Sequence, residues 1–146
     1  MNQPSNHPLK VLFVCIGNSC RSQMAEAYAN HFGKGKLQAF SAGSHPLGVI
    51  AAETYEVMRE KGISLEGQSS KSVREVSVAE MDVVVGMGFE VASSVPAGFK
   101  GRVVEWHIPD PYAHGMDTFR DVRDVIERQV LALITDLLPP TPPHSR

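Results

Sequence analysis

The feature that most constrains the fold is a wholly apolar segment that leads directly into a glycine-containing loop and a helical pattern. The segment is Val11-Leu12-Phe13-Val14, and its β-branched and aromatic side chains are typical of a central strand buried on both faces. Residues 22–32 are rich in good helix formers and are followed by Gly33, a natural helix stop. This order indicates the strand, tight loop and helix of one β–α unit.

Strands and helices continue to alternate along the chain. Apolar runs and helical spacing predict further strands at 37–42, 83–85 and 102–106 and helices at 49–61 and 118–138, with Gly62 capping the 49–61 helix. The alternation predicts an α/β fold of three layers, in which four parallel strands carry helices on both faces. Ligands bind at the carboxyl edge of such sheets, which is where the loop 15–22 lies.

Length, charge and cysteine count narrow the class of protein. The 146 residues contain no repeat or internal linker, so we expect one domain over 10–138, a disordered lead-in at 1–9 and a flexible tail at 139–146. A net charge of -2 argues against a general nucleic-acid binder, and no apolar run approaches the roughly 20 residues of a membrane span. With two cysteines, Cys15 and Cys20, the chain fits a reducing cytoplasm better than a secreted disulfide scaffold.

The loop after the first strand has the composition of an oxyanion site. Gly17 permits a turn that a side chain would block, and successive backbone amides can then form an anion nest at a helix N-terminus. Arg21 adds a planar fork that matches two oxygens of phosphate or arsenate. The residues expected to bind the anion through this loop are Ile16, Gly17, Asn18, Ser19, Cys20 and Ser22.

Cys15 is the candidate nucleophile. The helix N-terminus and Arg21 both favour a thiolate, and Ser22 is placed to donate a hydrogen bond to it. The alternative is a buried structural cysteine with Arg21 in a surface ion pair, but the combination of strand, glycine, Cys, Arg, Ser and helix in register favours the catalytic interpretation. Cys20 is either a small loop residue or a thiol that traps oxidised Cys15 as a disulfide.

Asp110 is the candidate general acid. It lies between Pro109 and Pro111 on a stiff segment after the fourth strand, and therefore at the same edge as Cys15. The alternative is a turn residue that caps the next helix. Asp117, next to Thr118 at the start of the final helix, is expected to be an N-cap. The six histidines show no metal-ligand spacing, so we assign no metal and no cofactor.

The segment 15–22, together with Asp110-Pro111-Tyr112, resembles the low-molecular-weight protein tyrosine phosphatase superfamily, which includes the thioredoxin-coupled arsenate reductases. The resemblance spans Lys10 to about Leu138 and implies a flavodoxin-like fold with four strands. It implies that Cys15 is the nucleophile, that Arg21 binds the anion, that Ser22 tunes the thiol and that Asp110 is the general acid. It also implies that Ser41 in Ser41-Ala42-Gly43 supports Asn18.

Within the superfamily the motifs point in two directions. Gln23 stands where the phosphatases usually have proline, which resembles the arsenate reductases. The coupled reductases, however, pass oxidation from the loop cysteine to two further cysteines after the third strand. Gly88 and Val95 occupy those positions here, so an intramolecular relay of three cysteines is impossible.

The sequence also differs from some arsenate reductases at a cation site. Some arsenate reductases bind potassium through the equivalents of Asn18, Glu26 and Ser41 plus a carboxylate, at a position that matches Lys71 here. The Lys71 ammonium either replaces the potassium and supports the loop directly, or it is a solvated surface group.

Three functions follow from these residues. The first is a cytoplasmic phosphatase that hydrolyses phosphate monoesters of the phosphotyrosine kind through a phosphocysteine. The second is an arsenate reductase that uses an external thiol, such as glutathione, mycothiol or a thioredoxin- or glutaredoxin-type donor. The third is a non-catalytic oxyanion-binding module, against which the intact nucleophile, arginine and acid argue.

Overall fold

The computed structural model describes residues 7–88 and 91–138, so most of the predicted lead-in and all of the predicted tail lie outside the described residues. The first strand begins at Leu9, inside the segment expected to be disordered. Within the described ranges no helix is long and apolar enough to cross a membrane.

The chain forms a single parallel sheet with helical connections. In chain order the elements are β1 (Leu9–Cys15), α1 (Arg21–Phe32), β2 (Leu37–Gly43), α2 (Ala52–Arg59), the 3-10 helices η1 (Val73–Glu75) and η2 (Val78–Glu80), β3 (Val83–Met87), the 3-10 helix η3 (Val91–Ser94), β4 (Arg102–Trp106) and α3 (Met116–Leu137). The strand order is β2-β1-β3-β4, with every pairing parallel. The predicted four-stranded parallel sheet is confirmed.

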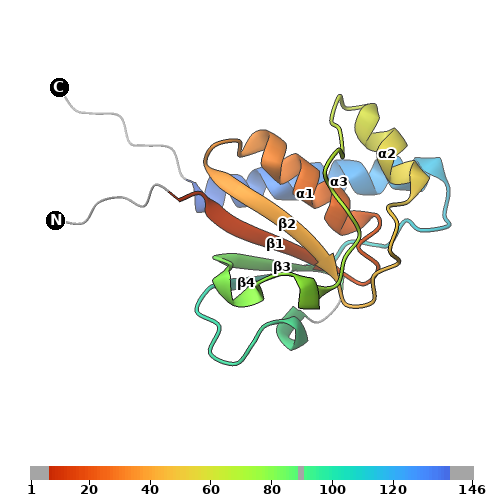
Figure 1. Ribbon diagram of the computed structural model, residues 1–146. Coiled ribbons are helices and arrows are strands. Elements are labelled where there is room, and N and C mark those ends of the chain that lie inside the picture. The colour runs from red at the N-terminus through yellow and green to blue at the C-terminus, as the bar shows by residue number, and fades with distance from the viewer. Residues whose placement is uncertain (1–6, 89–90, 139–146) are drawn as a thin grey trace, which may run out of the picture.

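The two faces of the sheet are covered differently. On one face the alternate residues Val11 and Phe13 of β1 pack with the apolar sides of α1, α2 and α3. On the other face Leu12 and Val14 join a smaller cluster, which is covered by the segments that carry η1, η2 and η3 (Figure 1). All four of these β1 residues are fully buried, as expected for a central strand.

The predicted helix 49–61 is shorter in the structure. It begins at Ala52 because the preceding residues bind the loop after β1 instead: Leu47 N–H donates to the Gly17 carbonyl, and Ala51 N–H donates to Ser19. It ends at Arg59, and the turn that follows closes at Gly62 with φ of 73°. Gly62 therefore ends the turn after the helix rather than capping the helix itself.

The start of α3 also differs from the prediction. The N-cap residue is Gly115, with φ of 90°, and the helix begins at Met116. Asp117 is therefore inside the first turn, where its carboxylate pairs with Arg120 at 2.9 Å. A negative charge in a first helical turn is favourable through the helix dipole, so Asp117 does mark the start of the helix, although the helix begins two residues earlier than predicted.

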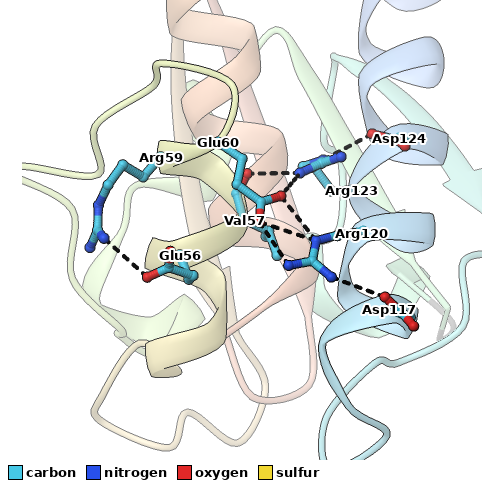
Figure 2. Close-up of polar contacts among 8 residues, drawn as sticks. All are labelled: Glu56, Val57, Arg59, Glu60, Asp117, Arg120, Arg123 and Asp124. Carbon is cyan, nitrogen blue, oxygen red and sulfur yellow. Dashed lines mark hydrogen bonds and ion pairs between the residues drawn. The ribbon is translucent and has the colours of Figure 1, made fainter.

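A cluster of charges joins α2 to α3 (Figure 2). The Glu60 carboxylate, just after α2, accepts hydrogen bonds from Arg120 at 2.9–3.1 Å and from Arg123 at 2.6 Å. Each arginine has a second acidic partner on its own helix, Asp117 for Arg120 and Asp124 for Arg123. Hydrogen bonds from the two arginines lower the pKa of Glu60.

We expect Glu60→Gln to lower the thermal midpoint at pH 7. Because the folded-state pKa of Glu60 is lowered, its contribution is present above the unfolded value of about 4.3 and is lost as pH falls through the folded value. The difference in midpoint between wild type and Glu60→Gln should therefore shrink below about pH 4.3. Thermal unfolding at a series of pH values measures it.

Glu56→Gln is the matched control, because Glu56 pairs with Arg59 on the same helix and does not join α2 to α3 (Figure 2). Its effect should be smaller, as expected of an exposed pair three residues apart. A Glu60→Gln effect of the same size at low and neutral pH would contradict the assigned role of the cluster.

Candidate active site

Residues 15–22 connect the end of β1 to the start of α1, at the carboxyl edge of the sheet. The carbonyls of five consecutive loop residues accept hydrogen bonds from groups outside the loop. Cys15, Ile16 and Gly17 are bound by the amides of Ser44, His45 and Leu47; Asn18 is bound by Gln23 Nε2, and Ser19 by Ala51 N–H and Thr54 Oγ1. In a trans peptide the N–H points opposite to the C=O, so the amides that follow these carbonyls face the inside of the loop. Inward-facing amides of this kind are the backbone geometry that an anion nest requires.

Asn18, rather than Gly17, makes the sharp turn of the loop. Its φ is 48°, a left-handed conformation that asparagine tolerates better than most residues. Three contacts hold it there: Nδ2 donates to Ser22 Oγ at 2.8 Å, Oδ1 accepts from Lys71 N–H at 2.8 Å, and the carbonyl accepts from Gln23 Nε2 at 3.0 Å. The conformation is therefore fixed without a ligand.

The sulfur of Cys15 lies at the base of the loop with two donors beside it. Ser22 Oγ is 2.9 Å away and Asn18 N–H donates to the sulfur at 3.3 Å. Since Ser22 Oγ already accepts from the Asn18 amide, its own hydrogen is available for Cys15. These two contacts fix the position of the sulfur at the base of the loop.

Arg21 is buried and oriented by two carbonyls. Its Nη1 donates to Met87 O at 2.8 Å and to Ile108 O at 2.9 Å, which links the ends of β3 and β4 to the loop. Its Nε is buried without a hydrogen-bond partner in the part of the chain that the structure describes. An unpaired buried donor is costly, so an acceptor beside this nitrogen would be favourable.

Gly88 makes room for the guanidinium. Its φ is 100°, and a Cβ built on it would lie 2.4 Å from Arg21 Nη1 and 3.2 Å from the Ile108 carbonyl. Gly88 is one of the positions that match a relay cysteine in the coupled arsenate reductases. With this backbone conformation a side chain at position 88 and the observed position of Arg21 are incompatible.

Asp110 lies across the pocket from the nest. Its Oδ2 is 3.6 Å from Arg21 Nη2, and its Oδ1 accepts from Tyr112 N–H at 3.1 Å. The side chain is 54% exposed. Asp110 is therefore only partly buried. The structure thus brings Asp110 to the same pocket as Cys15 and Arg21.

The pocket is completed by Tyr112 of the Asp110-Pro111-Tyr112 motif and by His45 and Leu47, which the sequence did not single out. His45 and Leu47 come from the loop after β2. Their place after a strand was visible in the sequence, but no motif distinguishes these two residues. Cys20 also lines the pocket; burial raises the pKa of its thiol to about 11, so this cysteine is protonated at neutral pH.

Ser41 and Lys71 support the loop in ways that differ from the expectation. The Ser41 hydroxyl donates to Glu26 at 2.6 Å instead of contacting Asn18. The Lys71 ammonium donates to the Ser69 carbonyl at 2.7 Å, whereas its backbone N–H binds Asn18. The contact of Lys71 with the loop is therefore made by the backbone, which any non-proline residue would provide.

A family model described as "Low molecular weight phosphotyrosine protein phosphatase" matches residues 10–139. The chain belongs to this family, as its motifs predicted, and its predicted fold and its class as an enzyme are confirmed. The family includes relatives with two different named activities.

Among the relatives, the chain is 33% identical to the glutaredoxin arsenate reductase of Synechocystis sp., over 88% of this chain and 98% of that protein. It is 34% identical to the low molecular weight protein-tyrosine-phosphatase YfkJ of Bacillus subtilis, over 86% and 96% of the two chains. Two solved structures superpose with a TM-score of 0.78: an arsenate reductase in the phosphate binding state, 31% identical, and a low molecular weight protein tyrosine phosphatase from T. tengcongensis, 28% identical. They cover 88% of this chain and 98% and 99% of their own chains.

We expect Gly88→Ala to weaken oxyanion binding, because the new methyl group would displace Arg21. Hydrogen bonds to charged groups contribute about 1.5–3 kcal/mol, so the affinity for inorganic phosphate, measured by calorimetry, should fall roughly 10- to 100-fold. Gly98→Ala is the matched control, since Gly98 also has a positive φ of 79° but has open space around its Cα. Both variants should lose some stability, but an equal loss of phosphate affinity would show that backbone strain alone is responsible.

Proposed function

We propose that this protein is a cysteine-dependent phosphatase that hydrolyses aryl phosphate monoesters of the phosphotyrosine kind. The observation that carries the proposal is the convergence of a hydrogen-bonded Cys15 sulfur, an inward-facing amide nest and Arg21 on one pocket, with Asp110 at its rim. The apolar walls Leu47 and Tyr112 suit an aromatic leaving group.

The reaction proceeds in two displacements. Cys15 Sγ attacks the phosphorus while the loop amides and Arg21 bind the non-bridging oxygens, which carry the developing charge. Asp110 gives a proton to the leaving phenolic oxygen on the side opposite the sulfur. Water then attacks the phosphocysteine, with Asp110 as base, and the Ser22 hydroxyl stabilises the departing thiolate.

The proposal is tested by the leaving-group dependence of Asp110→Asn. Wild type should turn over both phenyl phosphate and 4-nitrophenyl phosphate, and Cys15→Ser should turn over neither while still binding phosphate through the nest. Asp110→Asn should lose about 10²- to 10⁴-fold on phenyl phosphate, whose leaving group needs the proton, and less on the nitrophenyl ester. An active Cys15→Ser variant, or equal losses on both esters, would count against this mechanism.

Arsenate reduction is the second candidate, favoured by the similarity to proteins named arsenate reductases. Cys15 would displace water from arsenate, and an external thiol would then attack the Cys15 sulfur to release arsenite and leave a mixed disulfide. A second thiol would regenerate Cys15. Cys20 is poorly suited to the resolving step, because its raised pKa keeps it protonated and the thiolate is the nucleophile.

We therefore expect arsenate reduction to require a small thiol or a glutaredoxin-type donor. The assay compares arsenite release with glutathione, with mycothiol and with thioredoxin plus its reductase alone. Sustained turnover with thioredoxin alone would refute this requirement and would direct the next test to Cys20→Ser. Both candidate reactions need reduced thiols, and the free cysteines Cys15 and Cys20 are consistent with the cytoplasm as the compartment.

A further inference from the structure

Exposed apolar side chains gather at the mouth of the oxyanion pocket. Among the described residues, large apolar side chains that remain exposed include Ile16, Leu47, Val49 and Tyr112, at 46%, 53%, 66% and 54%. Scattered single residues of this kind are normal on a protein surface, but a contiguous group beside a reactive site marks a binding surface.

Two hollows share this mouth. The first is the oxyanion pocket, and the second lies beside it, between the loop after β2, the start of α2 and the loop after β4. The two hollows have Ser19, Leu47 and Tyr112 in common. On its far side the second hollow is lined by aliphatic residues, including Val49, Ile50 and Ala113, and its one charged lining residue is Glu53. We call the second hollow the flanking hollow.

The flanking hollow is held in shape by the contacts that fix the nest. Leu47 N–H donates to the Gly17 carbonyl at 3.0 Å, and Ala51 N–H donates to the Ser19 hydroxyl at 2.9 Å. The backbone on both sides of Val49 is therefore tied to the β1–α1 loop. A preformed apolar site loses little conformational entropy on binding, so even a small contact area can contribute to affinity.

An inorganic anion held inside the nest would not contact this surface. We propose that the flanking hollow binds an apolar side chain adjacent to the phosphotyrosine of a polypeptide substrate; this rests on the proposed phosphatase function. With the tyrosine ring between Leu47 and Tyr112, the main chain leaves at the mouth, and the next residue lies about 3.3–3.6 Å further along. Glu53 in the hollow and Asp110 at the rim repel acidic neighbours.

The test uses three phosphotyrosyl peptides that are identical except for the residues on either side of the phosphotyrosine, which are Leu, Ser or Asp. Wild type should show kcat/KM in the order Leu, Ser, Asp, with Leu about 3- to 10-fold above Ser, the range expected for one partly buried apolar side chain. Val49→Ser should abolish the Leu preference and leave turnover of 4-nitrophenyl phosphate unchanged. Val49 contacts the flanking hollow and is not among the lining residues of the oxyanion pocket.

Val103→Ser is the matched control, because Val103 is also an exposed valine but lies near the start of β4, at the opposite end of the strand from the site. It should keep the Leu preference.

Equal kcat/KM for the Leu and Ser peptides in wild type, or a Leu preference that survives in Val49→Ser, would overturn the inference. Turnover of the aryl phosphate in the same experiment would still support the phosphatase. A dimer that dissociates in Val49→Ser, without any peptide preference, would assign the hollow to a second copy of the chain and overturn the inference too. Absence of aryl phosphate turnover would overturn both proposals.

Discussion

The site depends on one constraint: the carbonyls of residues 15–19 must be bound from outside so that the amides can face inward. The loop cannot achieve this alone, because the donors that bind these carbonyls all come from residues outside it. The loop after β2 provides four backbone donors, α2 provides Thr54, and Gln23 of α1 donates to the Asn18 carbonyl. The anion nest is thus a product of the tertiary fold, and its geometry should persist only while these neighbours remain docked.

A second network positions the cation of the site. Arg21 donates hydrogen bonds to the carbonyls of Met87, at the end of β3, and Ile108, just after β4. These two carbonyls fix the orientation of the guanidinium in the absence of a ligand. Gly88 is part of the same arrangement, because the space that a side chain would take is filled by Nη1. Of the two positions that match relay cysteines, Gly88 therefore lacks both the thiol and the space for a side chain.

Much of this was predictable from sequence. The buried strand at 11–14, the loop 15–22 and the helix after it were found because local signals and burial agree there, and Asp110 was found because prolines fix its surroundings. The shortened α2 was not predictable, since residues 49–51 have an acceptable helical pattern and only the tertiary hydrogen bonds to Gly17 and Ser19 remove them from the helix. The roles of Gly88 and Gln23 were missed because both depend on partners far away in the sequence. In the exposed apolar group at the mouth of the pocket, Leu47 and Val49 belong to no sequence motif.

The helix α1 begins at Arg21, and its N-cap residue Cys20 provides no side-chain cap. The first turn contains no acidic residue, and the Nε of Arg21 is buried and unpaired among the described residues. The protein therefore keeps a local deficit of negative charge in its interior. Under the proposed function, a bound oxyanion would supply the missing cap, and phosphate in the loop would then stabilise the folded protein. Stability and product inhibition would share one origin, because a substitution that stabilises the empty site would also weaken phosphate binding.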